Sequence, residues 1–473
     1  MAKQQSLMNE PAAPAGLFDW ARRRLASVWR DIAASPPGEA EEPIEAQIRA
    51  CLEGRGGEVS ARNRAARLAR TYLGLAPAGQ RAFLETLAGF DSDPGALARA
   101  YQALQEAEDP AARAGATVAL RRVLEPPRQK LLRQFTSIPN GVKFLVDLRA
   151  TLRQANDGPS LLALESDLHG LLASWFDIGF LELRRIDWSS PASLLERLVG
   201  YEAVHSIRSW RDLKNRLDSD RRCYAFFHPR MPDEPLIFVE VALVQGLAES
   251  VQKLLDEKAP LLDPHTADTA IFYSISNCQS GLSGISFGNF LIKRVVEELT
   301  HEFRNLHTFA TLSPVPGFRR WLGELLATGP DGLFSTEEAA SLRTAAPADK
   351  PAAETGAAAL LSILARRGWW RDPAMARAAE PVLRRLCARY LLAESNGSRA
   401  LDPVAHFHLS NGARLERINM LADVSERGVK EGATLMVNYL YDPERIEEWH
   451  EDYMGAGKRN ASTAVRKLLR GWS

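Results

Sequence analysis

Apolar side chains recur at helical spacing through most of the first 175 residues of the chain. In the segment 143–154, for example, Phe144, Leu148 and Leu152 fall on one face of a helix. Runs of β-branched residues are almost absent before residue 200, and short stretches rich in Gly, Pro and Asp separate the helical segments. This pattern predicts an all-helical bundle for the first part of the chain.

Beyond residue 200 the pattern changes to short β-rich runs bounded by turn residues. Strands are predicted over residues 223–228, 236–244, 269–276, 307–313 and 433–441. A glycine-containing loop and a helix over residues 290–303 lie between the third and fourth of these strands. Because strand, loop, helix and strand in this order form a βαβ unit, we expect part of the sheet to be parallel.

The last third of the chain returns to helical patterns. Ser335 followed by Glu338 has the spacing of a capping box, and residues 381–392 form a strong helical pattern. At 473 residues the chain is longer than one hydrophobic core usually supports. The sequence therefore predicts an α+β protein, with an all-helical bundle domain over residues 1–175 and a mixed α/β domain with a helical insertion over residues 176–473.

Charge and composition narrow the classes of function. Lys plus Arg and Asp plus Glu both number 59, so no overall field attracts nucleic acid or an anionic membrane. No run of about 18 apolar residues is present to span a membrane. The amphipathic, Arg-rich segment 17–31 is like a transit peptide, but its acidic residues Asp19 and Asp31 favour an ordinary helix. The four cysteines form no CxxC pair, which suits a reducing cytosol, so we expect a cytoplasmic protein.

The residues 279–289 read QSGLSGISFGN and connect a predicted strand to a predicted helix. Gly281, Gly284 and Gly288 let a ligand approach the backbone closely, and the N–H groups and dipole of the helix N-terminus favour a phosphate. Glycines also serve plain tight turns, so a structural turn stays open as the alternative. Neither a Walker A motif nor GxGxxG is present, which disfavours nucleotide hydrolysis and dinucleotide redox chemistry. The arrangement is similar to the acyl-CoA site of the GNAT acyltransferase fold.

Several long blocks of sequence follow one another from about residue 161 onward. They are RRIDWSSPASLLERLVGYEAVHSI (184–207), HPRMPDEPLIFVEVAL (228–243), FYSISNCQSGLSGISFGNFLIKRVVEEL (272–299), TLSPVPGF (311–318), HFHLSNGARLERINMLADVSERG (406–428) and MVNYLY (436–441). Together these blocks resemble the malonyl-CoA decarboxylase family, whose members remove CO2 from malonyl-CoA to leave acetyl-CoA. The resemblance implies a GNAT-like catalytic domain, and a helical domain that assembles a homo-oligomer, either a tetramer or a dimer.

The resemblance also implies which residues act. Ser313 and His408 would form a hydrogen-bonded catalytic pair that protonates an enolate, and Tyr441 would assist it. The residues implied to bind malonyl-CoA are Ser283, Gly284, Ile285, Ser286, Phe287, Gly288, Asn289, Ser313 and His408. We expect other members to carry a carboxylate at the position of Ser286, so the role of that residue stays open. A histidine with an ordinary pKa would give one limiting group near about pH 6 to 7.

Neither a metal nor a separate cofactor is expected, because the thioester carbonyl of the substrate accepts the electrons itself. His406 and His408 alternate, so we expect both on one side of a strand, where a His-x-His pair can bind metal, but no third ligand can be named. Tyr439 and Tyr441 are likewise expected to share one strand face. Taken alone, Ser313 is also typical of a turn serine. A GNAT-type acyl-CoA-dependent acyltransferase and a non-catalytic acyl-CoA-binding scaffold remain as alternatives.

Overall fold

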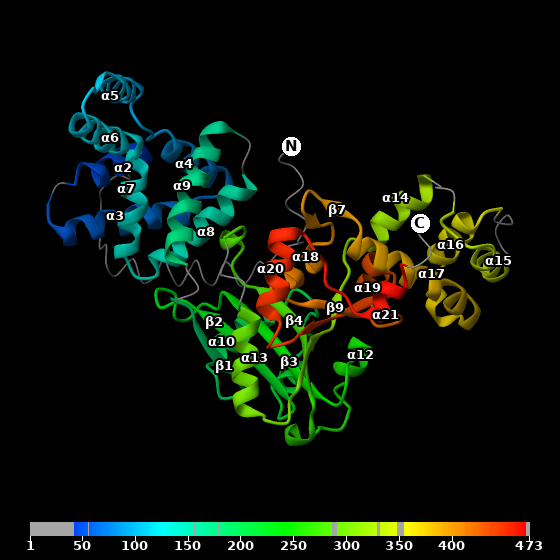
Figure 1. The fold of residues 1–473 in the computed structure, drawn as a ribbon. Helices are drawn as coiled ribbons and strands as arrows, with labels where there is room; N and C mark the ends of the chain where they lie inside the picture. Colours follow the sequence, from blue (N-terminus) through cyan, green and yellow to red (C-terminus); the bar gives the residue numbers. More distant parts are fainter. Residues whose placement is uncertain are drawn as a thin grey trace.

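The computed structural model consists of a helical part, a mixed sheet and a helical arm (Figure 1). The structure describes residues 42–54, 56–155, 158–176, 180–285, 291–328, 332–347 and 354–469. The helix expected over residues 17–31 lies outside these ranges. No helix within them is long and apolar enough to cross a membrane.

The first part of the described chain is helical, as its pattern predicts. Its helices are α2 (Ile44–Glu53), α3 (Glu58–Gly74), α4 (Pro77–Ala88), α5 (Pro94–Glu106), α6 (Pro110–Leu124), α7 (Pro127–Gln134), α8 (Gly141–Gln154) and α9 (Pro159–Trp175). Several of them begin with proline, whose fixed φ suits the first helical position. Phe144 of α8 packs edge-on against Tyr72 and Phe135, with ring centroids 5.7 and 4.9 Å apart, and this aromatic contact lies in the core.

A mixed sheet follows the helical part. Its strands are β1 (Glu182–Ile186), β2 (Arg221–Phe227), β3 (Ile237–Val244), β4 (Thr269–Asn277), β5 (Thr308–Thr311), β6 (Ser313–Pro314), β9 (Arg414–Asn419) and β10 (Met436–Tyr441). They lie in the order β1-β2-β3-β4-β5-β10-β6, and β9 pairs with β10. β4 and β5 are parallel, and helix α13 (Leu291–Glu302) connects them. The predicted βαβ unit is therefore confirmed.

The strand predicted over residues 307–313 is divided in the structure. β5 ends at Thr311, which lies opposite Phe272 at the end of the parallel pairing with β4. Ser313 instead pairs with Val437 of β10. The parallel pairing thus ends just before Ser313, and this serine stands where β5 no longer runs beside β4.

Two other strand predictions differ from the structure. β10 begins at Met436 rather than at residue 433, because Ala433 and Thr434 have positive φ angles of 51° and 72°. β1 and β9 are not predicted, because their sequences ELRRI and RLERIN each carry three charged residues instead of a β-rich run.

Helices cover both faces of the sheet (Figure 1). α10 (Ala192–Tyr201) and α11 (Trp210–Arg216) pack on the face that carries Phe238. α13 packs on the other face through Val295 and Leu299, within the core that also includes the helical part. The sheet is therefore buried on both sides, which explains its nearly continuous apolar strands.

A helical arm separates β6 from the last strands. It is built from α14 (Phe318–Thr328), α15 (Thr336–Ala345), α16 (Gly356–Ala365) and α17 (Pro373–Leu392), and it is followed by the β7–β8 hairpin (Ser395–Asn396, Arg399–Ala400). The remaining helices are α12 (Val251–Leu254), α18 (Pro403–Ser410), α19 (Glu426–Gly432), α20 (Ile446–Ala456) and α21 (Thr463–Lys467). The capping box of Ser335 and Glu338 is confirmed at the start of α15. The helix predicted from residue 381 starts earlier, at Pro373, and contains Pro381.

Candidate active site

Ser313, His408 and Tyr441 meet in the structure, although they lie far apart in the sequence. The Oγ atom of Ser313 is 2.8 Å from Nε2 of His408, and Nδ1 of His408 is 2.8 Å from the hydroxyl oxygen of Tyr441. All three side chains are buried. The three residues that the family resemblance singles out as catalytic therefore form one continuous chain of hydrogen bonds.

Strand β10 supplies two aromatic contacts to His408. Alternate residues of a strand face the same side of a sheet. Tyr441 bonds to the imidazole, and the ring of Tyr439 stacks on it with centroids 4.5 Å apart and an interplanar angle of 25°. The expectation that these two tyrosines share a strand face is confirmed.

Thr311 is a member of the same polar group that the sequence did not indicate. Its Oγ1 atom lies 2.9 Å from Oγ of Ser313 and accepts the backbone N–H of Tyr439 at 3.1 Å. Thr311 and Ser313 are two residues apart on the same run, so the alternation of an extended chain brings both hydroxyls to one side. Thr311 thereby fixes Ser313 with respect to β10.

The expected placement of His406 and His408 on one face of a strand is wrong. Both residues lie on helix α18, where positions two apart point in roughly opposite directions, about 200° around the axis. The Nδ1 atom of His406 accordingly lies 2.8 Å from the hydroxyl oxygen of Tyr453 in α20, away from Ser313. A signal for this helix was present, since Asp402 followed by Pro403 is a typical helix start. Within the described ranges, no group of three or more His, Cys, Asp or Glu side chains is placed to hold a metal ion.

The electrostatic environment of His408 differs from that expected of an exposed histidine. Burial lowers the pKa of His408 to about 3, because the interior disfavours the charged imidazolium. This value contradicts the expectation that His408 is a limiting group near pH 6 to 7. Burial also raises the pKa of the Tyr441 phenol well above its ordinary value. Both groups are therefore neutral at neutral pH, and in a neutral imidazole one nitrogen donates while the other accepts.

The described part of the predicted CoA loop packs on the helical part of the chain. Nη1 of Arg149 in α8 donates to the backbone oxygens of Gly281 and Ser283 at 2.6 and 3.0 Å, and Arg149 also forms an ion pair with Glu165 of α9. Gly284 has a φ of +80°, which favours glycine at that position. The loop residues with described positions make no hydrogen bond to Ser313 or His408.

The remaining predicted members of this loop lie outside the described residues. They are Ser286, Phe287, Gly288 and Asn289. Ser283, Gly284 and Ile285 lead toward them from the short 3-10 helix η4 (Ser280–Leu282). No local pattern indicates Arg149 as a contact of this loop, because the contact joins residues more than 130 positions apart.

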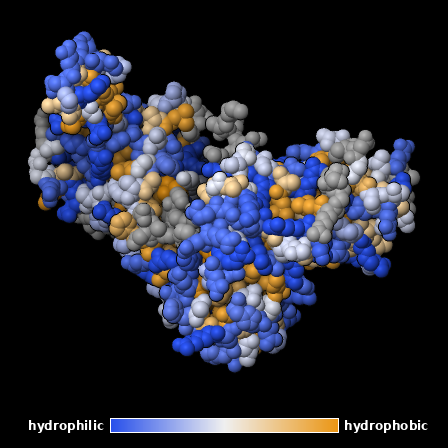
Figure 2. Space-filling view, in the orientation of Figure 1, coloured by the Kyte–Doolittle hydropathy of each residue, from blue (hydrophilic) through white to orange (hydrophobic). Residues whose placement is uncertain are grey.

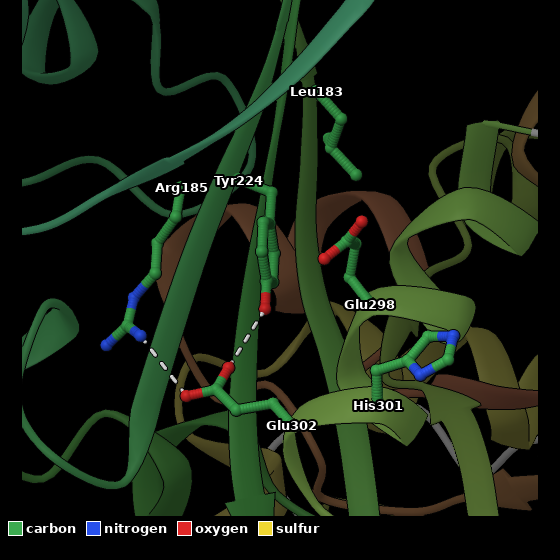
Figure 3. A pocket seen from close by; sticks show the side chains of 6 residues that line it. All are labelled: Leu183, Arg185, Tyr224, Glu298, His301 and Glu302. Atoms are coloured by element: carbon green, nitrogen blue, oxygen red, sulfur yellow. Dashed lines mark hydrogen bonds and ion pairs between the residues drawn. The ribbon is translucent and has the colours of Figure 1, made fainter.

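A pocket of about 460 Å³ lies at another place, between strands β1 and β2 and the end of α13 (Figure 3). Its lining residues are Leu183, Arg185, Tyr224, Glu298, His301 and Glu302. The carboxylate of Glu302 accepts hydrogen bonds from Arg185 and Tyr224 across it. None of the predicted site residues lines this pocket, and two carboxylates do not suit a polyanionic ligand such as CoA.

A helical part followed by a mixed sheet, with a buried hydrogen-bonded chain of Ser313, His408 and Tyr441 at the end of a parallel strand pair, defines a class of α+β protein. Comparison with family models identifies the family of the chain. Residues 90–176 match the malonyl-CoA decarboxylase N-terminal domain, and residues 179–473 match the malonyl-CoA decarboxylase C-terminal domain. The chain belongs to the malonyl-CoA decarboxylase family.

Individual members of this family are also similar to the chain in sequence and structure. The chain is 37% identical over 427 residues to the mitochondrial malonyl-CoA decarboxylase of Anser anser anser, which covers 86% of this chain and 84% of that protein. It is 38% identical over 416 residues to the mitochondrial malonyl-CoA decarboxylase of Rattus norvegicus, covering 84% and 83% respectively. The crystal structure of the malonyl-CoA decarboxylase from Rhodopseudomonas palustris is similar, with a TM-score of 0.80 and 42% identity over 90% of this chain and 98% of that one.

Proposed function

We propose that this protein removes CO2 from malonyl-CoA and leaves acetyl-CoA. The observation that carries the proposal is the buried chain of Ser313, His408 and Tyr441 in a member of this family. The reaction needs a proton donor at the carbon that loses CO2, and this chain offers one.

The chemistry follows from the substrate and from the neutral state of His408. When the bond between carbon 2 and the carboxylate breaks, its electron pair passes into the thioester carbonyl and CO2 leaves. The resulting enolate takes the hydroxyl proton of Ser313 at carbon 2. Ser313 then takes the proton on Nε2 of His408, while Nδ1 receives the hydroxyl proton of Tyr441. Solvent returns one proton to Tyr441, which is the one proton that the overall reaction consumes.

This order of transfers suits a buried histidine. Each side chain gives one proton and receives one, so His408 need not carry a positive charge in a site that disfavours it. A transfer of this kind through a positioned side chain contributes about 10²–10⁴-fold to the rate. Thr311 and Tyr439 assist by fixing the orientations of Ser313 and the imidazole.

The remaining assignments of binding and assembly are part of the same proposal. Residues Ser283–Asn289 bind the CoA phosphates, supported by the glycine-rich approach to α13. A GNAT-like catalytic domain is supported by the parallel pairing of β4 and β5, beside antiparallel pairs among the other described strands of the sheet. No cofactor or metal takes part, and the protein acts as a homo-oligomer through its helical part. Location in the cytoplasm is supported by cysteines that are free and buried.

A direct assay tests the proposed reaction. The purified protein is incubated with malonyl-CoA without any acyl acceptor, and CO2 and acetyl-CoA are measured in the presence and absence of a strong chelator. We expect equal amounts of both products, with or without the chelator. Acyl transfer that requires an added amine would favour the acyltransferase alternative. Tight CoA binding without turnover would favour the scaffold, and loss of activity that zinc or manganese restores would contradict the metal-free mechanism.

A further inference from the structure

Asp402 is a fully buried carboxylate that directly precedes the helix carrying His408. Its Oδ1 atom accepts the backbone N–H groups of Val404 and Ala405 at 3.0 and 2.9 Å. These bonds make Asp402 the N-cap of α18, and they satisfy N–H groups that have no partner within the helix.

The second oxygen of the same carboxylate faces a different part of the chain. Oδ2 is buried and makes no hydrogen bond of normal distance and angle within the described structure. The Tyr390 hydroxyl and the Gly317 amide nevertheless lie close enough to lower the pKa of the carboxyl. A Cβ atom added to Gly317 would lie 2.2 Å from the Tyr390 hydroxyl oxygen and 4.0 Å from Oδ2 of Asp402. Gly317, Tyr390 and Asp402 therefore meet with no room for another side-chain atom.

The Asp402 carboxylate thus stands between the two chain segments that supply the proposed pair. One segment is α18, which ends two residues beyond His408. The other is the short connection from Ser313 to Gly317 at the start of α14. The 2.8 Å distance between Ser313 and His408 depends on how these segments lie with respect to one another.

We propose that Asp402 is a positioning residue, whose carboxylate fixes α18 against the segment that follows Ser313 and so aligns the pair. The inference rests on the proposed decarboxylation. It adds a residue that does not contact the reacting atoms and that acts through His408. An error of about 1 Å at a reacting group can change a rate by about 10²-fold, so a buried contact of this kind has a measurable effect.

The charge of Asp402 supports a functional role. Burial raises its pKa to about 6, even though the N–H groups of α18 and the Tyr390 hydroxyl oppose that change. The titratable side chains on which its charge acts are Cys387 and Tyr390 of α17 and Tyr439 of β10, and none of these carries a positive charge, whereas the guanidinium of Arg320 in α14 lies close enough to Tyr390 to lower the pKa of that phenol. A buried carboxylate without a cation destabilises a fold. A buried group that lowers stability in this way is expected at functional positions.

The raised pKa of Asp402 gives opposite pH dependences for stability and activity. The native carboxyl keeps its proton up to about pH 6, whereas an unfolded aspartate loses it near pH ~4. The Asp402 carboxyl therefore contributes stability that is present below about pH 4 and is lost as the pH rises to about 6. Activity should rise over the upper part of that range, because an ionised carboxylate binds the N–H groups of α18 more strongly than a neutral acid does.

The experiment compares Asp402→Asn with the wild type, since asparagine has the same shape and can still cap α18. We expect kcat for malonyl-CoA at pH 7.5 to fall about tenfold or more, with KM changed by less than about twofold. The acidic limb of the wild-type kcat profile, near pH 6, should be absent from the variant. The melting temperature at pH 7.5 should equal or exceed that of the wild type, because the variant buries no charge.

Two further variants make the test specific. Tyr390→Phe removes the hydroxyl that lowers the pKa of Asp402, so the acidic limb should move to higher pH while turnover at high pH is retained. Asp109→Asn is the matched control. Asp109 precedes Pro110, caps α6 through two bonds of 2.9 Å and is exposed, so wild-type turnover and an unmoved limb are expected.

Each outcome decides the inference. Wild-type turnover with an unmoved limb in Asp402→Asn overturns it and leaves the decarboxylase proposal standing. Lower turnover with the limb in place also overturns it, because a merely structural defect would not move the pH profile. If Asp402→Asn does not fold, Tyr390→Phe decides, since a shifted limb supports the inference and an unmoved limb overturns it. A wild-type protein without decarboxylase activity overturns the proposed function, and the inference with it.

Discussion

His408 lies between two neutral hydroxyls, and its burial determines how the proposed proton transfer works. With a pKa of about 3, the imidazole is neutral at the pH of a cell. It can then donate through one nitrogen only if it accepts through the other, so the hydrogen bonds to Ser313 and Tyr441 depend on each other. Replacement of Ser313 or Tyr441 removes one of the two hydrogen bonds that together select the tautomer of His408.

The first prediction concerns the charge of His408. We expect its ring to stay neutral from pH 8 down to pH 5, because burial disfavours the imidazolium. Nitrogen-15 NMR of histidine-labelled protein measures this, with His408→Gln identifying the signal. Because its pKa is lowered, the His408 side chain contributes stability that is fully present above about pH 6.5 and is lost as the pH falls below it. A signal that titrates between pH 6 and 7 would contradict this environment.

The second prediction concerns the coupling of Ser313 and His408. If they act as one unit, Ser313→Ala and His408→Ala should each lower kcat by about 10²-fold or more. The double variant should be little worse than the poorer single variant, because losses within one unit do not add. CoA binding, measured by calorimetry, should be retained in all three. Near-normal turnover in His408→Ala would refute the pair, and multiplicative losses would mean two independent roles.

At the scale of secondary-structure elements, α8 of the helical part packs directly against the 3-10 helix η4 of the sheet domain. Gly281 lies so near to α8 that a Cβ atom there would be 1.8 Å from the backbone oxygen of Val146. Arg149 completes the contact through two backbone oxygens. The helical part therefore holds the start of the proposed CoA loop in addition to any role in assembly.

The third prediction tests this contact. Gly281→Ala should raise KM for malonyl-CoA by about tenfold or more and lower the melting temperature, because the backbone of α8 cannot move away from the new methyl group. Gly115→Ala is the matched control, since a Cβ atom at this helical glycine meets no atom within 4 Å. That change should leave KM unaltered and stabilise α6 by about 0.5–1 kcal/mol. If the KM of Gly281→Ala equals that of the wild type, the contact between this loop and α8 does not affect substrate binding.

At the scale of the whole molecule, the α5–α6 hairpin projects from the helical part (Figure 1). Neither helix contains a buried residue, and Tyr101, Val118 and Leu124 are each 56% exposed. Hydrophobic side chains are visible on this projection in the space-filling view (Figure 2). Two amphipathic helices with so little buried surface are expected to gain stability from a second copy of the chain.

The fourth prediction follows from that surface. Replacement of both Tyr101 and Val118 by Arg should produce a smaller particle in light scattering, because charged side chains oppose burial at an interface. Leu261→Arg, at an exposed apolar position in the sheet domain, serves as the control and should leave the particle size unchanged. Deletion of the entire helical part would be a poorer test, since it also removes Arg149. If the particle size of the double variant is unchanged, the interface between copies of the chain lies outside the α5–α6 hairpin.

The order of helical and strand segments was predictable because it depends on spacings within a few residues. The periodicity of Phe144, Leu148 and Leu152 identifies α8, and the β-rich run at residues 236–244 identifies β3. The same local patterns failed at residues 406–408. There the alternation of two histidines suggested a strand, although Asp402 and Pro403 marked a helix start.

The site itself depends on contacts between segments that are distant in the sequence. Sequence blocks led to Ser313, His408 and Tyr441 through a family resemblance. Only the folded chain brings the two ring nitrogens of His408 within 2.8 Å of the Ser313 and Tyr441 hydroxyl oxygens. The lowered pKa of His408 arises from burial by many segments at once, so no local pattern carries it. The contacts of Asp402 with Tyr390 and of Arg149 with the proposed CoA loop also depend on tertiary packing, because each joins segments that are distant in the sequence. Spacing along the chain specifies the elements, whereas tertiary packing sets the distances, burial and charge on which the proposed chemistry depends.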